Sequence, residues 1–185
     1  MTQVLVSPFT LAETVIAFID AEAEAARNGK PSGIQAKLNA LIDPRVIEAL
    51  YRASQAGVPI ELHVRSLCRL RPGIPGVSET IRVFSTVGRF LEHSRVYRFH
   101  SGGADHIYLA SADWMERNLY RRVETAFPVL DPELKKRVVE EIFHQYDRDD
   151  AQTWSMAADG TYHKRMPLSD TPFSAQENLL RLCSS

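Results

Sequence analysis

The chain has 185 residues, a length that favours one domain with a substantial core. Hydrophobic residues make up 44% and charged residues 24%, as in soluble globular proteins, and no apolar run is long enough to span a bilayer. The N-terminus lacks the pattern of a signal peptide, and the two cysteines, Cys68 and Cys183, form no CxxC pair. We therefore expect a cytoplasmic protein with no transmembrane segment, disulfide framework or structural zinc site.

The charge is unevenly distributed, although the net charge is only −1. Residues 65–122 contain ten arginines, no lysine and five acidic residues, which gives this segment a net charge of +5. Arginine presents a planar fork of donors that suits phosphate or carboxylate groups. For many of these arginines a solvated surface position is the simpler interpretation. A basic central segment in a near-neutral chain does not predict a surface that coats nucleic acid non-specifically. No nucleic acid is therefore expected as a partner.

The first half of the chain predicts two helices and two strands. A capping box of Thr10 and Glu13 opens a helix over about 10–28, which Asn28-Gly29 ends. Alternating residues over 34–39 predict a strand. Asp43 and Pro44 begin a second helix that stops at Gly57, and a second strand follows over 59–65. This strand–helix–strand order implies a parallel pair of strands with a crossover helix.

The second half predicts further strands and one more helix. A loop rich in proline and glycine over 68–80 precedes a short strand over 81–85, and strands over 95–100 and 106–110 form a hairpin. A helix is expected over 131–146. We predict an α/β fold in residues 1–147, with a mixed, mostly parallel sheet flanked by helices. Periodicity fades after Asp147, so residues 148–185 are predicted to be a weakly structured extension, or ordered only against something else.

Polar residues repeatedly follow or open the predicted strands. Phosphoryl transfer needs forked cationic donors and a histidine that exchanges protons near neutral pH. Arg65 ends a parallel strand, where open α/β sheets usually bind ligands, and His93 with Arg95 opens a later one. Spacing alone favours a structural role for His93, as a histidine whose polar atoms are hydrogen-bonded at a strand edge. No glycine-rich phosphate loop is present, and the histidines show no metal-ligand spacing, so no metal site is predicted in this chain.

The motif His93-x-Arg95, followed by a strand and Ser111-Ala112-Asp113-Trp114-Met115-x-Arg117-Asn118, resembles the second half-site of polyphosphate kinases. Residues 29–65, 70–97, 110–124 and 127–138 also resemble the last catalytic domain of that family, which has a phospholipase-D-like fold. The resemblance covers about residues 2–146 and rests on long stretches, which makes it specific. It implies that the domain is one phospholipase-D-like half of a larger enzyme.

The resemblance implies reversible transfer of the terminal phosphate of ATP to inorganic polyphosphate, through a phosphohistidine on the preceding domain. His93 would then be the catalytic acid/base or would stabilise the transferring phosphate, and Arg65 would bind nucleotide phosphate. Magnesium is expected as a cofactor, with its ligands on the preceding domain, which is therefore an expected partner. Further candidates for contacts with ATP or polyphosphate are Arg95, Lys37, Arg71, Asn118, Arg121 and Arg122.

The chain also departs from the family. It lacks the phosphohistidine domain, and Ser66, Arg69 and Ala110 replace residues that are common in the family. We therefore expect the isolated chain to be inactive as a kinase. Two alternatives stay open. One is a non-catalytic polyanion-binding module, and the other is a dimeric phosphodiesterase in which each copy contributes His93, although Arg95 stands where that superfamily has lysine. The oligomeric state also stays open.

Overall fold

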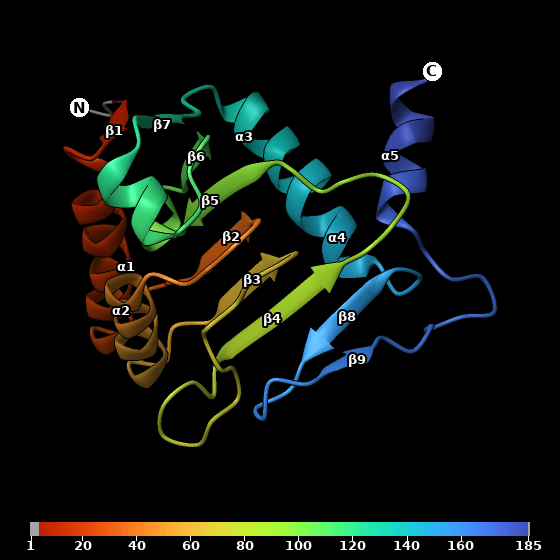
Figure 1. Cartoon of the computed structure of the whole chain (residues 1–185), viewed down its shortest axis with the longest axis horizontal. Helices are drawn as coiled ribbons and strands as arrows, with labels where there is room; N and C mark the ends of the chain where they lie inside the picture. The colour runs from red at the N-terminus through yellow and green to blue at the C-terminus, as the bar shows by residue number, and fades with distance from the viewer. Residues whose placement is uncertain (1–3, 185) are drawn as a thin grey trace.

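The structure, a computed structural model, describes residues 4–184, and these form one nine-stranded sheet with helices on both faces (Figure 1). The order across the sheet is β1-β7-β6-β5-β2-β3-β4-β8-β9. The strands are β1 (Leu5–Ser7), β2 (Ile34–Leu38), β3 (Ile60–Val64), β4 (Ile81–Thr86), β5 (Arg95–Phe99), β6 (His106–Ala110), β7 (Glu124–Pro128), β8 (Thr153–Met156) and β9 (Tyr162–Lys164).

The helices cover the two faces of the sheet in separate layers. They are α1 (Leu11–Arg27), α2 (Pro44–Gln55), α3 (Pro132–Val138), η3 (Val139–His144), α4 (Gln145–Arg148) and α5 (Ala175–Cys183), with the short turns η1 (Ser101–Gly103) and η2 (Arg117–Arg121). Tyr97 packs in the main core with α1 and α2, whereas its neighbour Val96 packs with Phe143 of η3. Because successive side chains of a strand point to opposite faces, α1–α2 and α3–η3–α4 lie on opposite faces (Figure 1).

The first two predicted helices are confirmed, although one of their start signals is wrong. Asp43 caps α2, since its Oδ1 accepts a hydrogen bond of 3.0 Å from the Val46 N–H. Thr10 makes no such bond to α1. A tight turn after β1 folds Thr10 back, and its hydroxyl accepts the Val6 N–H at 3.0 Å instead. Burial of one apolar face, not a capping box, therefore holds the start of α1.

The sheet is mixed, as predicted, but the expectation of a mostly parallel sheet is wrong. Only β2–β3 and β3–β4 pair in parallel among the described residues, and the other six pairings are antiparallel. The predicted parallel crossover and the predicted β5–β6 hairpin are both confirmed. The error arose because β1, β7, β8 and β9 were not predicted, and all four join the sheet in antiparallel fashion.

Residues 148–185 were predicted to be weakly structured or ordered only against something else, and the described part of this segment forms β8, β9 and α5, so the expectation of weak structure is wrong. β8 pairs with β4, so the tail extends the sheet. The carboxylates of Asp149 and Asp150 are buried and hold the chain that follows. Asp149 accepts the Ala175 N–H at 2.8 Å, and Asp150 accepts the Phe173 N–H at 2.7 Å. Order in the tail therefore comes from contacts distant in sequence, which periodicity cannot reveal.

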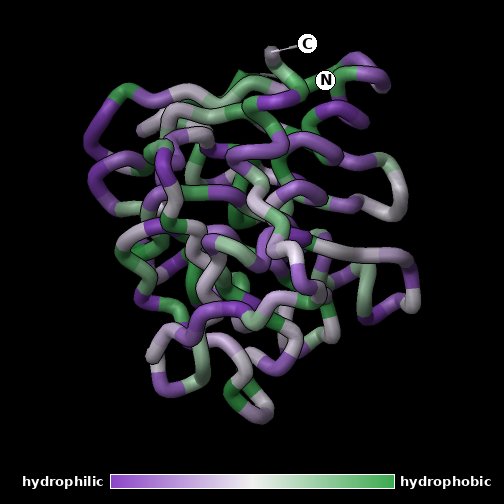
Figure 2. Tube along the Cα trace, turned by 90° about the vertical axis from the view of Figure 1, so that its right-hand side faces the viewer, coloured by the Kyte–Doolittle hydropathy of each residue, from purple (hydrophilic) through white to green (hydrophobic). Residues whose placement is uncertain are grey.

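Apolar packing extends through the middle of the fold. Figure 2 shows hydrophobic segments crossing the interior, while many outer turns are hydrophilic. The residues most completely buried include Trp114, Tyr97, Phe99 and Phe143. Within residues 4–184, no helix combines the length and apolar character that a membrane crossing requires.

Candidate functional site

The strand directions bring four separate parts of the chain to one edge of the sheet. β2 and β3 are parallel and end there, at Leu38 and Val64. β5 runs antiparallel to β2, so it starts at the edge where β2 ends, and β6 returns to the same edge. Residues that follow β2, β3 and β6 therefore meet residues that precede β5. They include Asn39, Arg65, His93 and Asp113.

Asp113 is the hub of this edge. Its side chain is buried, and its Oδ1 accepts the backbone N–H groups of Asn39 at 2.6 Å and Ala40 at 3.2 Å. Its Oδ2 accepts the Asn39 amide at 3.2 Å and an Arg95 guanidinium N–H at 3.1 Å. One carboxylate thus ties the end of β2 to the start of β5 through a buried ion pair.

Asp113 connects Arg65 to the chain around His93. The Oδ1 of Asn39 accepts the Nε–H of Arg65 at 2.6 Å, and Arg95 donates to the carbonyl of His93 at 3.2 Å. A continuous series of hydrogen bonds therefore runs from Arg65 through Asn39, Asp113 and Arg95 to His93. Within residues 4–184 the terminal nitrogens of Arg65 make no hydrogen bond, which leaves its fork available for an anion.

Lys37 and Glu92 form a buried pair beneath the same edge. Lys37 donates to Glu92 and to the Ser94 hydroxyl at 2.8 Å, and its ammonium lies 4.6 Å from the centre of the Tyr146 ring. Burial lowers the pKa of Lys37, and Glu92 offsets part of this effect. Burial alone would raise the pKa of Glu92, but Lys37 and hydrogen bonds from Gln176 and Tyr146 lower it overall. Lys37 is therefore already paired and buried, unlike the free fork of Arg65.

His93 lies in the exposed loop between β4 and β5. It lines a groove of about 430 Å³ formed with α5. A neighbouring groove of about 310 Å³ is lined by Arg65 and by residues 86–92, and the two share Phe90, Leu91 and Glu92. A larger cavity of about 820 Å³ between β7 and α3 is mostly apolar and contains no histidine in its lining. The two grooves are consequently the better match to phosphate chemistry.

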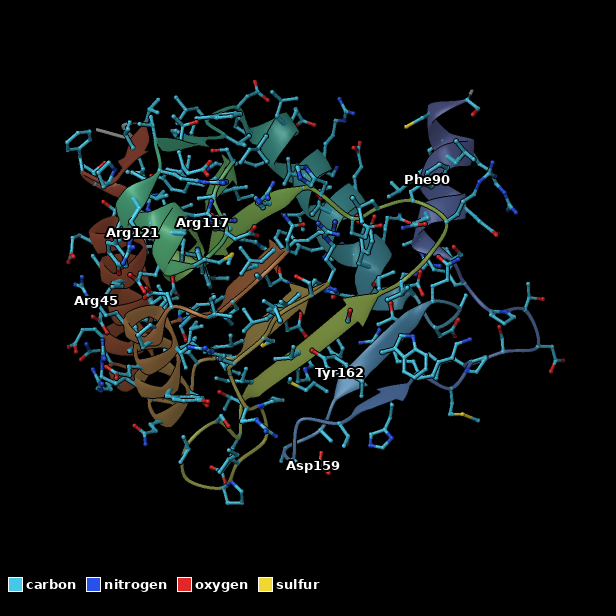
Figure 3. The ribbon with its side chains drawn as sticks, viewed as in Figure 1. Arg45, Phe90, Arg117, Arg121, Asp159 and Tyr162 are labelled. Atoms are coloured by element: carbon cyan, nitrogen blue, oxygen red, sulfur yellow. The ribbon has the colours of Figure 1, made fainter. Side chains whose placement is uncertain are left out.

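The remaining predicted residues lie away from this network. Asn118 is buried and donates to Glu124 at 2.6 Å, and Arg121 is exposed and pairs with Glu116. In Figure 3, Arg121 lies beside α1 and Phe90 lies beside α5, at opposite sides of the view. Arg71 lies against Gly160 in the β8–β9 turn. A phosphate-binding role for these residues stays a prediction.

Arg122 is exposed just after η2, and its part in polyanion binding also stays a prediction. Sequence reasoning missed Glu92, Tyr146 and Gln176, which hold the buried side of the His93 loop. Glu92 precedes His93 directly, but only the fold places Tyr146 and Gln176 beside it. No local pattern in the sequence could have identified these two residues.

The described residues offer no magnesium site. No group of three or more His, Cys, Asp or Glu side chains within residues 4–184 is placed to hold a metal ion. Magnesium prefers carboxylate and water oxygens, whereas the carboxylates of Glu92 and Asp113 at this edge are already bound to Lys37 and Arg95. The residues present therefore do not fit a resident magnesium ion.

The fold belongs to the phospholipase-D-like class. A phospholipase D family member, Nuc from Salmonella typhimurium, superposes with a TM-score of 0.61 at 16% identity, covering 85% of this chain and 98% of Nuc. The polyphosphate kinase of Porphyromonas gingivalis superposes with a TM-score of 0.93 at 38% identity, covering 100% of this chain and 28% of that one.

Sequence comparison then identifies the family. The profile described as polyphosphate kinase C-terminal domain 2 matches residues 4–176. The polyphosphate kinase of Xylella fastidiosa strain Temecula1 is 53% identical over 177 residues, 95% of this chain and 25% of the relative. That of Neisseria gonorrhoeae is 56% identical over 161 residues, 87% of this chain and 24% of the relative. The chain belongs to the polyphosphate kinase family as its C-terminal domain, and it spans about a quarter of the length of these relatives.

Proposed function

We propose that this chain supplies one half of a phosphoryl-transfer site that moves the terminal phosphate of ATP to polyphosphate and back. The other half, with the phosphohistidine and any magnesium ligands, would lie on a preceding domain of a longer cytoplasmic protein. Support comes from the family of the chain and from the short share of each relative that it matches. The isolated chain is accordingly expected to bind polyphosphate without synthesising it.

The series of hydrogen bonds from Arg65 to His93 is the observation that carries this proposal. Phosphoryl transfer depends mainly on positioning and on stabilising negative charge. Arg65, with a free fork, would hold the phosphate oxygens. His93, exposed at the groove, would exchange a proton with the transferring group or stabilise it. Lys37 and Arg95, already paired with carboxylates, would hold the geometry of the edge.

A binding experiment with a matched control tests the role of Arg65. Polyphosphate affinity would be measured at low and moderate salt for wild type, Arg65→Ala and Arg82→Ala. Arg82 is exposed and pairs with Glu61, at the opposite edge of the sheet, so its removal deletes the same charge elsewhere. Because a charged hydrogen bond contributes about 1.5–3 kcal/mol, Arg65→Ala should weaken binding roughly tenfold or more. Arg82→Ala should change affinity less than about twofold.

Equal losses in both variants would contradict the proposed site and favour a general polyanion-binding surface, with a steep dependence on salt in each case. Synthesis of polyphosphate from ATP by the wild-type chain alone would show that the half-site interpretation is wrong. Hydrolysis of a phosphodiester that His93→Ala abolishes, in a symmetric dimer, would favour the phosphodiesterase alternative instead.

A further inference from the structure

The loop that carries His93 has little apolar burial of its own. It joins β4 to β5 over residues 87–94, and several of its apolar side chains face solvent: Val87 is 65% exposed, Phe90 46% and Leu91 73%. Apolar packing, the usual source of loop order, is therefore weak here. Something else must set the path of the chain on which His93 sits.

Gln176, in the first turn of α5, supplies that restraint. Its side chain is buried, with the residue only 5% exposed. Its Oε1 accepts the Phe90 N–H at 2.9 Å, and its Nε2 donates to the Phe90 carbonyl at 2.8 Å. A single side-chain amide thus satisfies both backbone groups of Phe90, much as a neighbouring strand would. The same Nε2 also donates to Glu92, the residue next to His93.

The start of the loop is held from the same side. The Val87 N–H donates to the Gln152 carbonyl at 3.0 Å. Gly88 leaves room for the two glutamines, because a Cβ at this position would overlap the side-chain oxygens of Gln152 and Gln176. A side chain at position 88 would therefore push Gln176 away from Phe90.

Gln176 is itself fixed by buried groups at the start of α5. The Ser174 hydroxyl caps the helix by accepting the Glu177 N–H at 3.3 Å, and Asp149 accepts the Ala175 N–H at 2.8 Å. These bonds leave the first turn of α5 little freedom. The position of Gln176 is consequently set by the tail, and the loop takes its position from Gln176.

We propose that Gln176 is a positioning residue of the half-site, which acts through the backbone of Phe90 and the carboxylate of Glu92 to set where His93 stands. The C-terminal tail is then part of the functional site and not a separate extension. This inference rests on the proposed function in one respect, the role of His93. The restraint on the loop can be tested without it.

The test compares Gln176→Ala with Asn178→Ala. Asn178 is also on α5, and its amide donates to Gln145 at 2.8 Å without touching the loop. Gln176→Ala removes three hydrogen bonds to the loop, whereas Asn178→Ala removes one hydrogen bond, to Gln145 of α4, so Asn178→Ala controls for the loss of an α5 amide that does not contact the loop. Gln176→Ala should raise the amide exchange rate of Phe90 about tenfold, whereas Asn178→Ala should leave it within about twofold.

A second readout follows His93 itself. Wild type and Asn178→Ala should show the same imidazole nitrogen resonances and the same shift when polyphosphate is added. In Gln176→Ala the His93 resonances should move and broaden, and polyphosphate affinity should fall about threefold to tenfold. Gly88→Ala should produce both effects, because its added Cβ would displace the side chain of Gln176. It therefore provides a second variant if Gln176→Ala does not fold.

Equal exchange rates in the two α5 variants would overturn the inference. So would faster exchange at Phe90 with unchanged His93 resonances and unchanged affinity, because Gln176 would then only brace the loop. Absence of polyphosphate binding by wild type would count against the proposed function alone. In that case the exchange rates and the His93 resonances still decide whether Gln176 positions the loop.

Discussion

Replacing Asp113 tests whether the buried carboxylate holds the candidate site together. Asp113→Ala removes the acceptor of two backbone N–H groups and leaves Arg95, whose side chain is 14% exposed, without its partner. Breaking a buried ion pair in this way costs about 3–5 kcal/mol of the free energy of unfolding. A domain of this size loses about 2–4 °C of Tm per kcal/mol, so the Tm should fall by roughly 10 °C.

Asp113→Asn should lose about half as much, because its amide oxygen can still accept the Asn39 and Ala40 N–H groups while the pair with Arg95 loses its charge. Glu116→Ala is the matched control. Its partner Arg121 is exposed, and such a pair contributes at most about 1 kcal/mol. Urea unfolding and thermal scans of the three variants give the comparison. If Asp113→Ala lowers the free energy of unfolding by less than about 1 kcal/mol, the reasoning is refuted, because Asp113 would then contribute little to holding the edge together.

Two further predictions concern the tail and the thiols. Burial raises the pKa of Cys68 to about 11, whereas Cys183 is exposed, so iodoacetamide at pH 8 should label Cys183 at least roughly tenfold faster, as followed by mass spectrometry. Equal labelling would contradict the partly buried position of Cys68. Hydrogen bonds from the Leu168 and Phe173 N–H groups lower the pKa of Asp150, so its stabilising effect is present above the ordinary value of about 3.9 and is lost as pH falls. The stability gap between wild type and Asp150→Asn, measured by urea unfolding, should therefore shrink between pH 6 and pH 3, and a constant gap would count against this linkage.

The sequence predicted the elements whose signals are local. The start of α2 was readable because Asp43 and Pro44 are both start signals, and the β5–β6 hairpin was readable from alternation on either side of a glycine-rich turn. β1, β7, β8 and β9 were missed because each is defined by its partner strand, and β1, β8 and β9 are also only three or four residues long. A short strand gains its stability from pairing, which is a property of the fold.

The residues of the candidate site divide in the same way, into those with local sequence signals and those whose role depends on the fold. Arg65 and His93 were candidates because they stand near the ends of correctly predicted strands and because the surrounding segments resemble polyphosphate kinases. The part played by Asp113 could be seen only with the structure. Three of its four hydrogen bonds come from Asn39 and Ala40, more than 70 positions away in the sequence, and the fourth comes from Arg95. Lys37 was predicted to contact phosphate, and its burial against Glu92 depends on α4, which covers that face of the sheet.

The antiparallel direction of β5 is what assembles the site. β5 has five residues, and at about 3.3 Å per residue it spans roughly 16 Å. If β5 ran parallel to β2, its first residue would lie at the opposite edge of the sheet, and His93 would be separated from Arg65 by about that distance. The observed register instead places Val96 beside Lys37 and so brings Arg95 next to the end of β2. The reversal between β2 and β5 therefore explains why His93, which precedes one strand, and Arg65, which follows another, lie at the same edge of the sheet.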